Sequence, residues 1–275
     1  MISLLQLGQM ATDMAEGDRF ATKAVHSGTQ HIGDAVNTPI FQSSTYKLTD
    51  ERYAGWAAGA QHTLLYARLS TVNSDAVAQK LMALEGGEDA ETFSSGMGAI
   101  SATLMALLNQ GDHMVASADI YGGTYGLLTE EFPRFGISTT MADMRDPASY
   151  EAAIQENTKL LYIETLTNPV LKVCDIEAMA DVAKRHNLLL LIDNTFASPW
   201  GCKPLDMGVD LVLHSTTKYL GGHSDILGGA VVGSKDLIAQ IFMRKVHFGA
   251  APDPHSCYLL AVSYTHLRAH ETSAN

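Results

Sequence analysis

The chain has 275 residues, of which 46% are hydrophobic and 17% charged, so it can bury a substantial core and is not globally disordered. Its 18 basic and 30 acidic residues give a formal charge of −12. That balance argues against nucleic acid or an anionic membrane surface as the main partner, because both need clustered Lys and Arg. No run approaches the ~20 apolar residues of a membrane span, and residues 1–10 lack the basic start of a signal peptide. The 3 cysteines are scattered without metal-like spacing, so we expect reduced thiols, no metal site and a cytoplasmic location.

The N-terminal quarter of the chain differs from the rest in composition and in the spacing of its apolar residues. Residues 1–70 are rich in turn formers and polar residues, which predicts an extended arm. From residue 74 the spacing becomes helical, and residues 74–84 place Ala76, Val77, Leu81 and Leu84 on one face. A second helix is predicted over 98–108, directly after a Ser-Ser-Gly-Met segment.

Short apolar runs then alternate with helical stretches. We predict strands over 113–117, 159–163, 188–192, 211–213 and 230–232, and helices over 121–132 and 176–186. The 188–192 run is continuously apolar, which is typical of a strand buried on both faces of a parallel sheet. The alternation predicts an α/β fold, a mostly parallel sheet with helices on both faces. Ligands of such sheets bind beyond the carboxyl ends of the strands.

The last thirteen residues, 263–275, shift abruptly in composition and have no apolar period. One interpretation is a disordered tail. The other, which we favour, is sequence foreign to the protein, such as a frameshift or vector read-through. We therefore divide the chain into an N-terminal arm (1–70), a large domain (71–262) and a non-native tail (263–275).

Three polar segments are candidates for chemistry. Asp193 closes the 188–192 strand, where a carboxylate points into the ligand crevice, although an Asp there can also simply cap a turn. Lys218 lies in a segment of hydroxyls and glycines that follows the 211–213 strand. Ser95 and Gly96 precede a helix whose N–H groups can bind a phosphate. Together they supply what pyridoxal phosphate needs: donors for its phosphate, an anion for its ring nitrogen and an amine for its aldehyde.

Further segments extend this pattern in one consistent order. They are Thr38-Pro39-Ile40-Phe41-Gln42-Ser43-Ser44-Thr45, Tyr66-Ala67-Arg68, Ser95-Gly96-Met97, Asp119-Ile120-Tyr121-Gly122-Gly123-Thr124-Tyr125, Glu164-Thr165-Leu166-Thr167-Asn168-Pro169, Ile192-Asp193-Asn194-Thr195-Phe196 and Ser215-Thr216-Thr217-Lys218-Tyr219. With them the chain resembles the Cys/Met-metabolism (trans-sulfuration) family of pyridoxal-phosphate enzymes, of fold type I. Its members include cystathionine γ-synthase, cystathionine γ-lyase, methionine γ-lyase and the homoserine sulfhydrylases. The resemblance ends near Ala261 and implies the family's large domain, with its C-terminal small domain missing.

The resemblance implies roles for individual residues. Lys218 is implied as the lysine that carries the cofactor and relays protons, Asp193 as the partner of the ring nitrogen, and Tyr121 as the aromatic residue stacked on the ring. These three are the implied catalytic residues. The implied cofactor-binding residues are Ser95, Gly96, Met97, Tyr121, Glu164, Asn168, Asp193, Ser215, Thr217 and Lys218, together with Tyr66 and Arg68.

Tyr66 and Arg68 are implied to reach the cofactor phosphate of a neighbouring subunit, a role that suits the planar guanidinium. The implied functional unit is therefore a homodimer or a homotetramer. The chain departs from the family after this pair, because the family continues toward an Asn-Pro-Thr element, whereas this chain continues with Leu69-Ser70-Thr71-Val72-Asn73-Ser74. We expect the loss of that proline to alter the loop that holds Arg68.

The implied activity is γ-elimination or γ-replacement on sulfur amino acids or homoserine esters. Gly123 stands where methionine-specific lyases commonly have cysteine, which favours a cystathionine γ-lyase or γ-synthase over a methionine γ-lyase or homoserine sulfhydrylase. A second hypothesis is a cofactor-binding fragment without activity, because the family's substrate-carboxylate arginine lies in the missing domain. A third, a nicotinamide-dinucleotide-binding protein, lacks the glycine fingerprint it needs.

Overall fold

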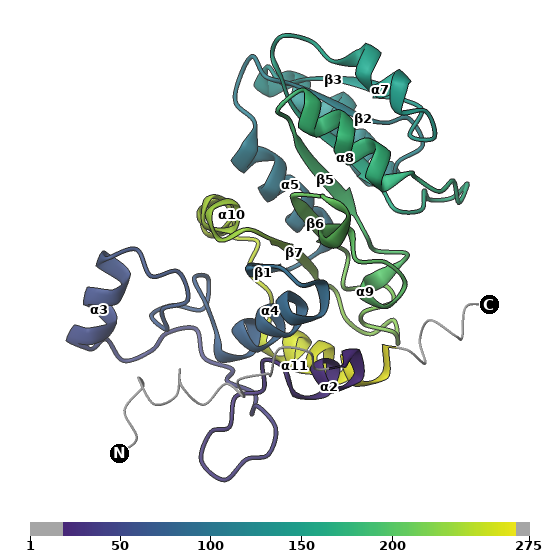
Figure 1. The fold of residues 1–275 in the computed structure, drawn as a ribbon. Helices are drawn as coiled ribbons and strands as arrows, with labels where there is room; N and C mark the ends of the chain where they lie inside the picture. The colour runs from purple at the N-terminus through teal and green to yellow at the C-terminus, as the bar shows by residue number, and fades with distance from the viewer. Residues whose placement is uncertain (1–18, 268–275) are drawn as a thin grey trace.

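The computed structural model describes residues 19–267, and its centre is a seven-stranded mixed sheet (Figure 1). The strand order is β1-β7-β6-β5-β4-β2-β3. Neighbours from β6 to β3 pair in parallel, whereas β7 runs antiparallel to both β6 and β1. The strands are β1 Asp89–Phe93, β2 His113–Ser117, β3 Ser138–Ala142, β4 Thr158–Glu164, β5 Leu189–Asp193, β6 Leu211–His214 and β7 Gly229–Gly233.

Helices cover both faces of this sheet, as the sequence predicts (Figure 1). One face carries α5 and α10, and the other carries α7 and α8 beside β2–β5 and α4 and α11 beside β1 and β7. The helices are α2 Phe20–His26, α3 Asp50–Ala57, α4 Val72–Glu85, α5 Gly96–Leu107, α6 Gly122–Gly126, α7 Pro147–Ala153, α8 Ile176–Arg185, α9 Ser198–Gly201, α10 Lys235–Phe248 and α11 Pro254–Ser263, with short non-α turns η1 Leu127–Glu131, η2 Phe132–Phe135, η3 Pro204–Met207 and η4 Tyr264–His266.

Strand β5 shows why the central strands are continuously apolar. Successive side chains of a strand point to opposite faces. Leu191 therefore packs in the cluster that contains α5, whereas Leu190 and Ile192 pack in the cluster that contains α8. All three are fully buried, and burying each such side chain contributes about 1.5–3 kcal/mol. The two clusters hold the carboxyl end of β5, and with it Asp193, in a fixed place.

Several predicted elements need correction. The helix predicted over 121–132 is a continuous run that changes type along its length, from α6 through the π-type η1 to the 3-10-type η2. Pro133 lies inside η2, and the run ends at Gly136, which has a left-handed backbone conformation. Strands β1 and β3 and helices α7, α10 and α11 have no counterpart in the predictions. The arm contains helices α2 and α3 within its described part, and residues 1–18 lie outside the described residues.

The C-terminal segment is described only as far as residue 267. Tyr264 and Leu267 are buried in the cluster formed by α4 and α11. Residues 268–275 of the predicted tail lie outside the described residues, and the foreign origin of the tail stays a prediction. Among residues 19–267, we find no helix with both the length and the apolar character needed to cross a membrane.

Candidate functional site

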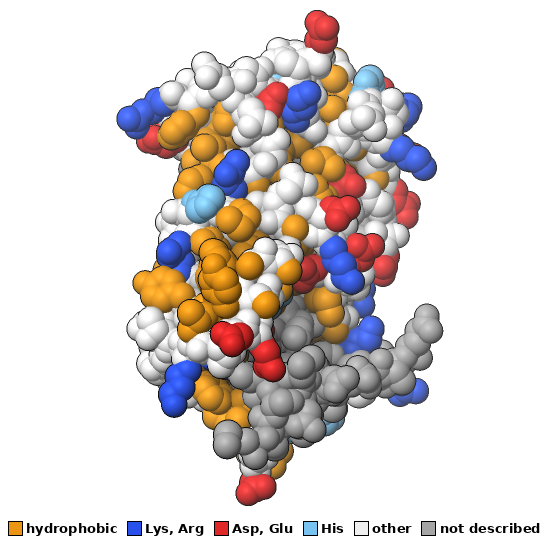
Figure 2. Space-filling model, turned by 90° about the vertical axis from the view of Figure 1, so that its left-hand side faces the viewer, with side chains coloured by type: hydrophobic (Ala, Val, Ile, Leu, Met, Phe, Trp, Pro, Cys, Tyr) orange, Lys and Arg blue, Asp and Glu red, His pale blue; other side chains and the backbone are white. Residues whose placement is uncertain are grey.

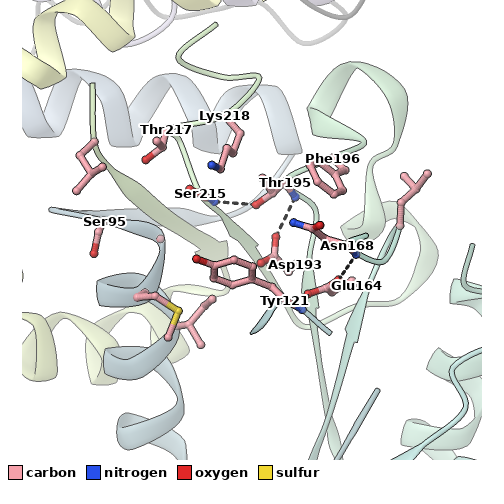
Figure 3. A pocket seen from close by; sticks show the side chains of 15 residues that line it. Ser95, Tyr121, Glu164, Asn168, Asp193, Thr195, Phe196, Ser215, Thr217 and Lys218 are labelled. Carbon is pink, nitrogen blue, oxygen red and sulfur yellow. Dashed lines mark hydrogen bonds between the residues drawn. The ribbon is translucent and has the colours of Figure 1, made fainter. Parts of the chain in front are cut away.

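A cavity of about 220 Å³ opens at the carboxyl ends of the central strands, beside the N-terminus of α5 (Figure 3). This is the edge of the sheet at which ligands of α/β proteins bind. Ten of the twelve residues predicted from the sequence line it. They are Ser95, Gly96, Met97, Tyr121, Glu164, Asn168, Asp193, Ser215, Thr217 and Lys218.

One end of the cavity is built to receive an anion. The Ser95 hydroxyl caps α5 by accepting a hydrogen bond from the Gly98 N–H at 3.0 Å, which leaves the first N–H groups of the helix to face the cavity. A Cβ atom at Gly96 would lie 2.8 Å from Cβ of Ser215, so only glycine allows α5 to approach the end of β6 this closely. Helix N-termini carry a partial positive charge. The arrangement suits a phosphate group.

The other end of the cavity holds a half-buried carboxylate. Asp193 is the last residue of β5, and its Oδ1 accepts a hydrogen bond from the Thr195 N–H at 2.9 Å (Figure 3). Burial raises the pKa of Asp193, while Thr195 and His214 lower it. A cationic group bound in the cavity would stabilise the ionised form of this carboxylate. The Ser215 N–H donates to Oγ1 of Thr195 at 2.8 Å, which ties β6 to this end of the site.

Glu164 organises two loops of the site. It is paired with Asp193 across β4 and β5, and it accepts hydrogen bonds from the N–H groups of Tyr121 at 2.8 Å and Asn168 at 3.3 Å. Burial, followed by the Asp193 charge, raises the pKa of Glu164 to about 8. Glu164 thus holds the backbone of Tyr121 and of Asn168, which both line the cavity, through hydrogen bonds from their N–H groups.

Lys218 and Tyr121 both reach the cavity. Figure 3 shows the Lys218 amine and the Asp193 carboxylate directed into the same space, with the Tyr121 ring beside them. A Cβ atom at Gly123 would lie 2.6 Å from Cε1 of Tyr121 and 3.1 Å from Sδ of Met97. The glycine therefore gives the Tyr121 ring the room that it occupies next to Met97.

Tyr66 and Arg68 do not join this cavity within one chain. Arg68 instead donates through Nη1 to the carbonyl of Val246 at 2.6 Å, and its guanidinium lies 5.4 Å from the centre of the Tyr66 ring. The helix that follows Tyr66 and Arg68, α4, does not need the family's proline at its start. Its N-terminus is instead capped by a reciprocal capping box between Thr71 and Ser74. The segment that departs from the family therefore still gives α4 a capped N-terminus.

The sequence interpretation missed part of the cavity wall. Thr195 lies two residues after Asp193 and donates its N–H to that carboxylate, so it could have been found as the residue that orients it. Among the described residues, no group of His, Cys, Asp and Glu could hold a metal ion. The five cavity residues without a predicted role are Ile100, Leu166, Thr195, Phe196 and Leu227.

Comparison with known proteins identifies the family of the chain. Residues 21–275 match the family model described as Cys/Met metabolism PLP-dependent enzyme. The chain is 41% identical over 247 residues to L-methionine gamma-lyase of Porphyromonas gingivalis, covering 88% of this chain and 62% of that protein. It is 44% identical over 244 residues to cystathionine gamma-lyase of Bacillus subtilis, covering 87% of this chain and 62% of that protein.

A solved structure shows the same fold. The crystal structure of cystathionine gamma-lyase from Lactobacillus plantarum complexed with L-serine superposes with a TM-score of 0.84 at 38% identity, covering 92% of this chain and 65% of that chain. The chain thus spans 62% of the length of the two curated relatives above. By its sequence and its fold, the chain belongs to the Cys/Met-metabolism family of pyridoxal-phosphate-dependent enzymes.

Proposed function

We propose that the cavity binds pyridoxal phosphate through Lys218 and that the protein acts in trans-sulfuration. The observation that carries the proposal is the shared cavity of Lys218, Asp193 and the anion-binding N-terminus of α5. An amine, a carboxylate and a phosphate cradle are the three groups that this cofactor requires. The close approach of Gly96 to Ser215 supports the phosphate end, and the Asp193 carboxylate in the cavity wall supports a cationic partner at the other end.

Each residue then has a defined task. The N-terminus of α5, with Ser215 and Thr217, holds the phosphate, and Asp193 pairs with the ring nitrogen. The bound cofactor supplies an electron-accepting ring that stabilises negative charge on a substrate carbon. Lys218 supplies the amine for attachment and afterwards carries protons between substrate carbons. Tyr121 covers the ring, and Asn168 lies beside it.

We propose γ-elimination or γ-replacement on sulfur amino acids or homoserine esters as the reaction. The relatives include a methionine γ-lyase and a cystathionine γ-lyase, and Gly123 favours the cystathionine-specific enzymes. Because the chain spans 62% of the two relatives above, cofactor binding without turnover is the second candidate.

A second copy of the chain is the partner that we propose for Tyr66 and Arg68. Arg68 lies against α10, and Figure 2 shows apolar side chains gathered on the face that carries α3 and α10. The exposed members on these helices are Tyr53, Trp56, Met243 and Phe248. Exposed apolar patches of this kind mark protein–protein interfaces.

The test measures cofactor attachment directly. The protein should develop a visible absorbance band with pyridoxal phosphate, and reductive trapping with peptide mass spectrometry should place the cofactor on Lys218. Lys218→Ala should abolish both signals, whereas Lys235→Ala, at an exposed lysine on α10, should retain both. Attachment at another lysine would refute the assignment. Assays with cystathionine, methionine and homoserine esters would then separate an active enzyme from a cofactor-binding fragment.

A further inference from the structure

Two neighbouring residues of α10 hold the segment that carries Arg68. The Arg68 side chain donates through Nη1 to the carbonyl of Val246 at 2.6 Å. The amine of Lys245 donates to the carbonyl of Leu69, the next residue of the segment, at 3.1 Å. Because two adjacent residues of one helix contact two adjacent residues of the segment, these hydrogen bonds fix both its position and its direction.

Lys245 is itself buried and held by a carboxylate. Its Nζ lies 2.8 Å from Oε1 of Glu91 in β1, and both side chains are 2% exposed. A buried ion pair is a weak source of stability, because apolar residues of similar volume often do as well. The lysine amine, however, also supplies the donor for the Leu69 carbonyl, which an apolar side chain cannot do. The contact with Leu69 is therefore the property that distinguishes Lys245 from an apolar residue.

The backbone on both sides of Arg68 is fixed as well. The Ala67 N–H donates to the carbonyl of Ser44 at 2.9 Å, and the Ser70 hydroxyl donates to Oδ1 of Asp75 at 2.6 Å. The Arg68 side chain is nevertheless exposed. Its contact with α10 engages Nη1, and a guanidinium has further N–H groups with which it can bind an anion. The chain thus presents a cationic side chain on a backbone that is held in place.

We propose that Lys245 is a positioning residue for Arg68. Held by Glu91, it fixes the backbone at Leu69, so that the Arg68 guanidinium is presented to the cofactor phosphate of a second copy of the chain. The inference rests on the cofactor and the partner proposed above. Lys245 does not line the described cavity, so it acts through the segment and on the cofactor of the other copy. The rival explanation is that the ion pair only joins α10 to β1, in which case it would affect stability alone.

Two variants separate the contact with Leu69 from the buried charge. Lys245→Met removes the contact and leaves Glu91 without a counter-charge. Lys245→Met/Glu91→Gln also removes the contact, but it leaves no buried charge. The glutamine keeps a side-chain oxygen for the Thr92 N–H, which Glu91 accepts at 2.7 Å. The two variants therefore lack the same hydrogen bond to the segment and differ in the cost of burial.

Arg68→Ala and Lys80→Met complete the set. Arg68→Ala removes the guanidinium and measures what it contributes to cofactor binding. Lys80→Met is the matched control, because Lys80 is also a buried lysine, 4% exposed, whose amine donates to backbone carbonyls. Its acceptors are the carbonyls of Ala24 at 2.9 Å and Ala261 at 3.3 Å, which lie outside the Arg68 segment.

Pyridoxal phosphate affinity is measured together with thermal unfolding of the cofactor-free protein. We expect the dissociation constant to rise about 10- to 100-fold in Arg68→Ala and in both Lys245 variants, the loss of one hydrogen bond between charged groups. The double variant should melt at a higher temperature than Lys245→Met, because no uncompensated charge remains. Lys80→Met should lower the melting temperature and leave the affinity unchanged. Affinity thus follows the contact with Leu69, whereas stability follows the charge.

A mixed assembly tests whether the effect acts on the other copy. Chains with Lys245→Met/Glu91→Gln are co-expressed with Lys218→Ala chains that carry a different affinity tag, and hybrids are isolated through both tags. The Lys218→Ala chain lacks the amine for cofactor attachment but contributes an intact Arg68 segment. The hybrid should therefore attach the cofactor with the affinity of the unsubstituted protein, whereas assemblies of the double variant alone should bind weakly.

The proposal is overturned if the hybrid binds as weakly as the double variant alone. It is also overturned if the double variant regains affinity together with stability, or if Lys80→Met weakens binding as much. Should Lys245→Met fail to fold, the double variant decides. An unchanged affinity in Arg68→Ala would instead refute the proposed partner role of Arg68, and absence of cofactor binding by the unsubstituted protein would refute the cofactor assignment, so these failures are distinguishable.

Discussion

The close contact between α5 and β6 gives a sharp test of the phosphate site. In Gly96→Ala the new methyl group would lie 2.8 Å from Cβ and 2.9 Å from Oγ of Ser215. Carbon atoms in contact are ordinarily about 3.5–4.0 Å apart, so α5 or β6 must move by several tenths of an ångström. Overpacking of this kind costs about 1–3 kcal/mol. The same movement separates the two halves of the phosphate cradle.

We therefore expect Gly96→Ala to weaken pyridoxal phosphate binding by about 10- to 100-fold, the equivalent of about 1.4–2.8 kcal/mol. Equilibrium dialysis measures the affinity, and urea unfolding of the cofactor-free protein measures the stability. Gly126→Ala is the control, because a Cβ atom there meets nothing within 4 Å. That substitution should leave binding unchanged. The reasoning fails if Gly96→Ala binds the cofactor as tightly as the unsubstituted protein does.

Three further predictions concern charge and space. Burial raises the pKa of Glu164 from 4.5 to about 8, so unfolded protein loses this proton before folded protein does. The free energy of unfolding, measured in urea, should thus fall by about 1.4 kcal/mol per pH unit between the two pKa values. In Glu164→Gln this contribution to the pH dependence should be absent. Equal pH dependence of the unsubstituted protein and the variant would contradict the prediction. Lys245→Met leaves Glu91, the buried ion-pair partner of Lys245 at 2.8 Å, without a counter-charge. The variant should lose about 3–5 kcal/mol of unfolding free energy, measured by thermal unfolding. A loss below about 1 kcal/mol would contradict a stabilising role for the pair. Gly123→Cys should displace the Tyr121 ring, now 2.6 Å from the new Cβ, and alter the spectrum of the bound cofactor; an unchanged spectrum would argue against that contact.

The sequence predicts the elements that carry strong local signals. Strand β5 is a continuous apolar run, and the polar residues at the carboxyl ends of β5 and β6 are recognisable because ligands of parallel sheets bind there. Asp193 and Lys218 could therefore be placed in one site from the residues alone, before any family resemblance. Their convergence in one cavity agrees with that expectation.

Other elements depend on partners that are far away in the sequence. Strand β1 contains a buried glutamate, Glu91, which makes sense only beside Lys245, 154 residues later. Strand β3 is an edge strand with a polar, partly exposed sequence, so it has no apolar run to reveal it. Phe196 and Leu227 line the cavity because of how their loops fold back, which no local pattern encodes. These features require the tertiary structure.

The reversed direction of β7 has a consequence for the lysine loop. Because β7 runs antiparallel beside β6, residues 215–228 form a loop whose two ends lie next to each other. The Thr216 N–H donates to the Gly228 carbonyl at 3.0 Å, and the Gly228 N–H donates to Oγ1 of Thr217 at 3.1 Å. Lys218 is the next residue after these hydrogen bonds, whereas residues 222–225 lie in the middle of the loop. Insertions within 222–225 should therefore leave Lys218 in its position, because the hydrogen bonds that close the loop lie at its two ends.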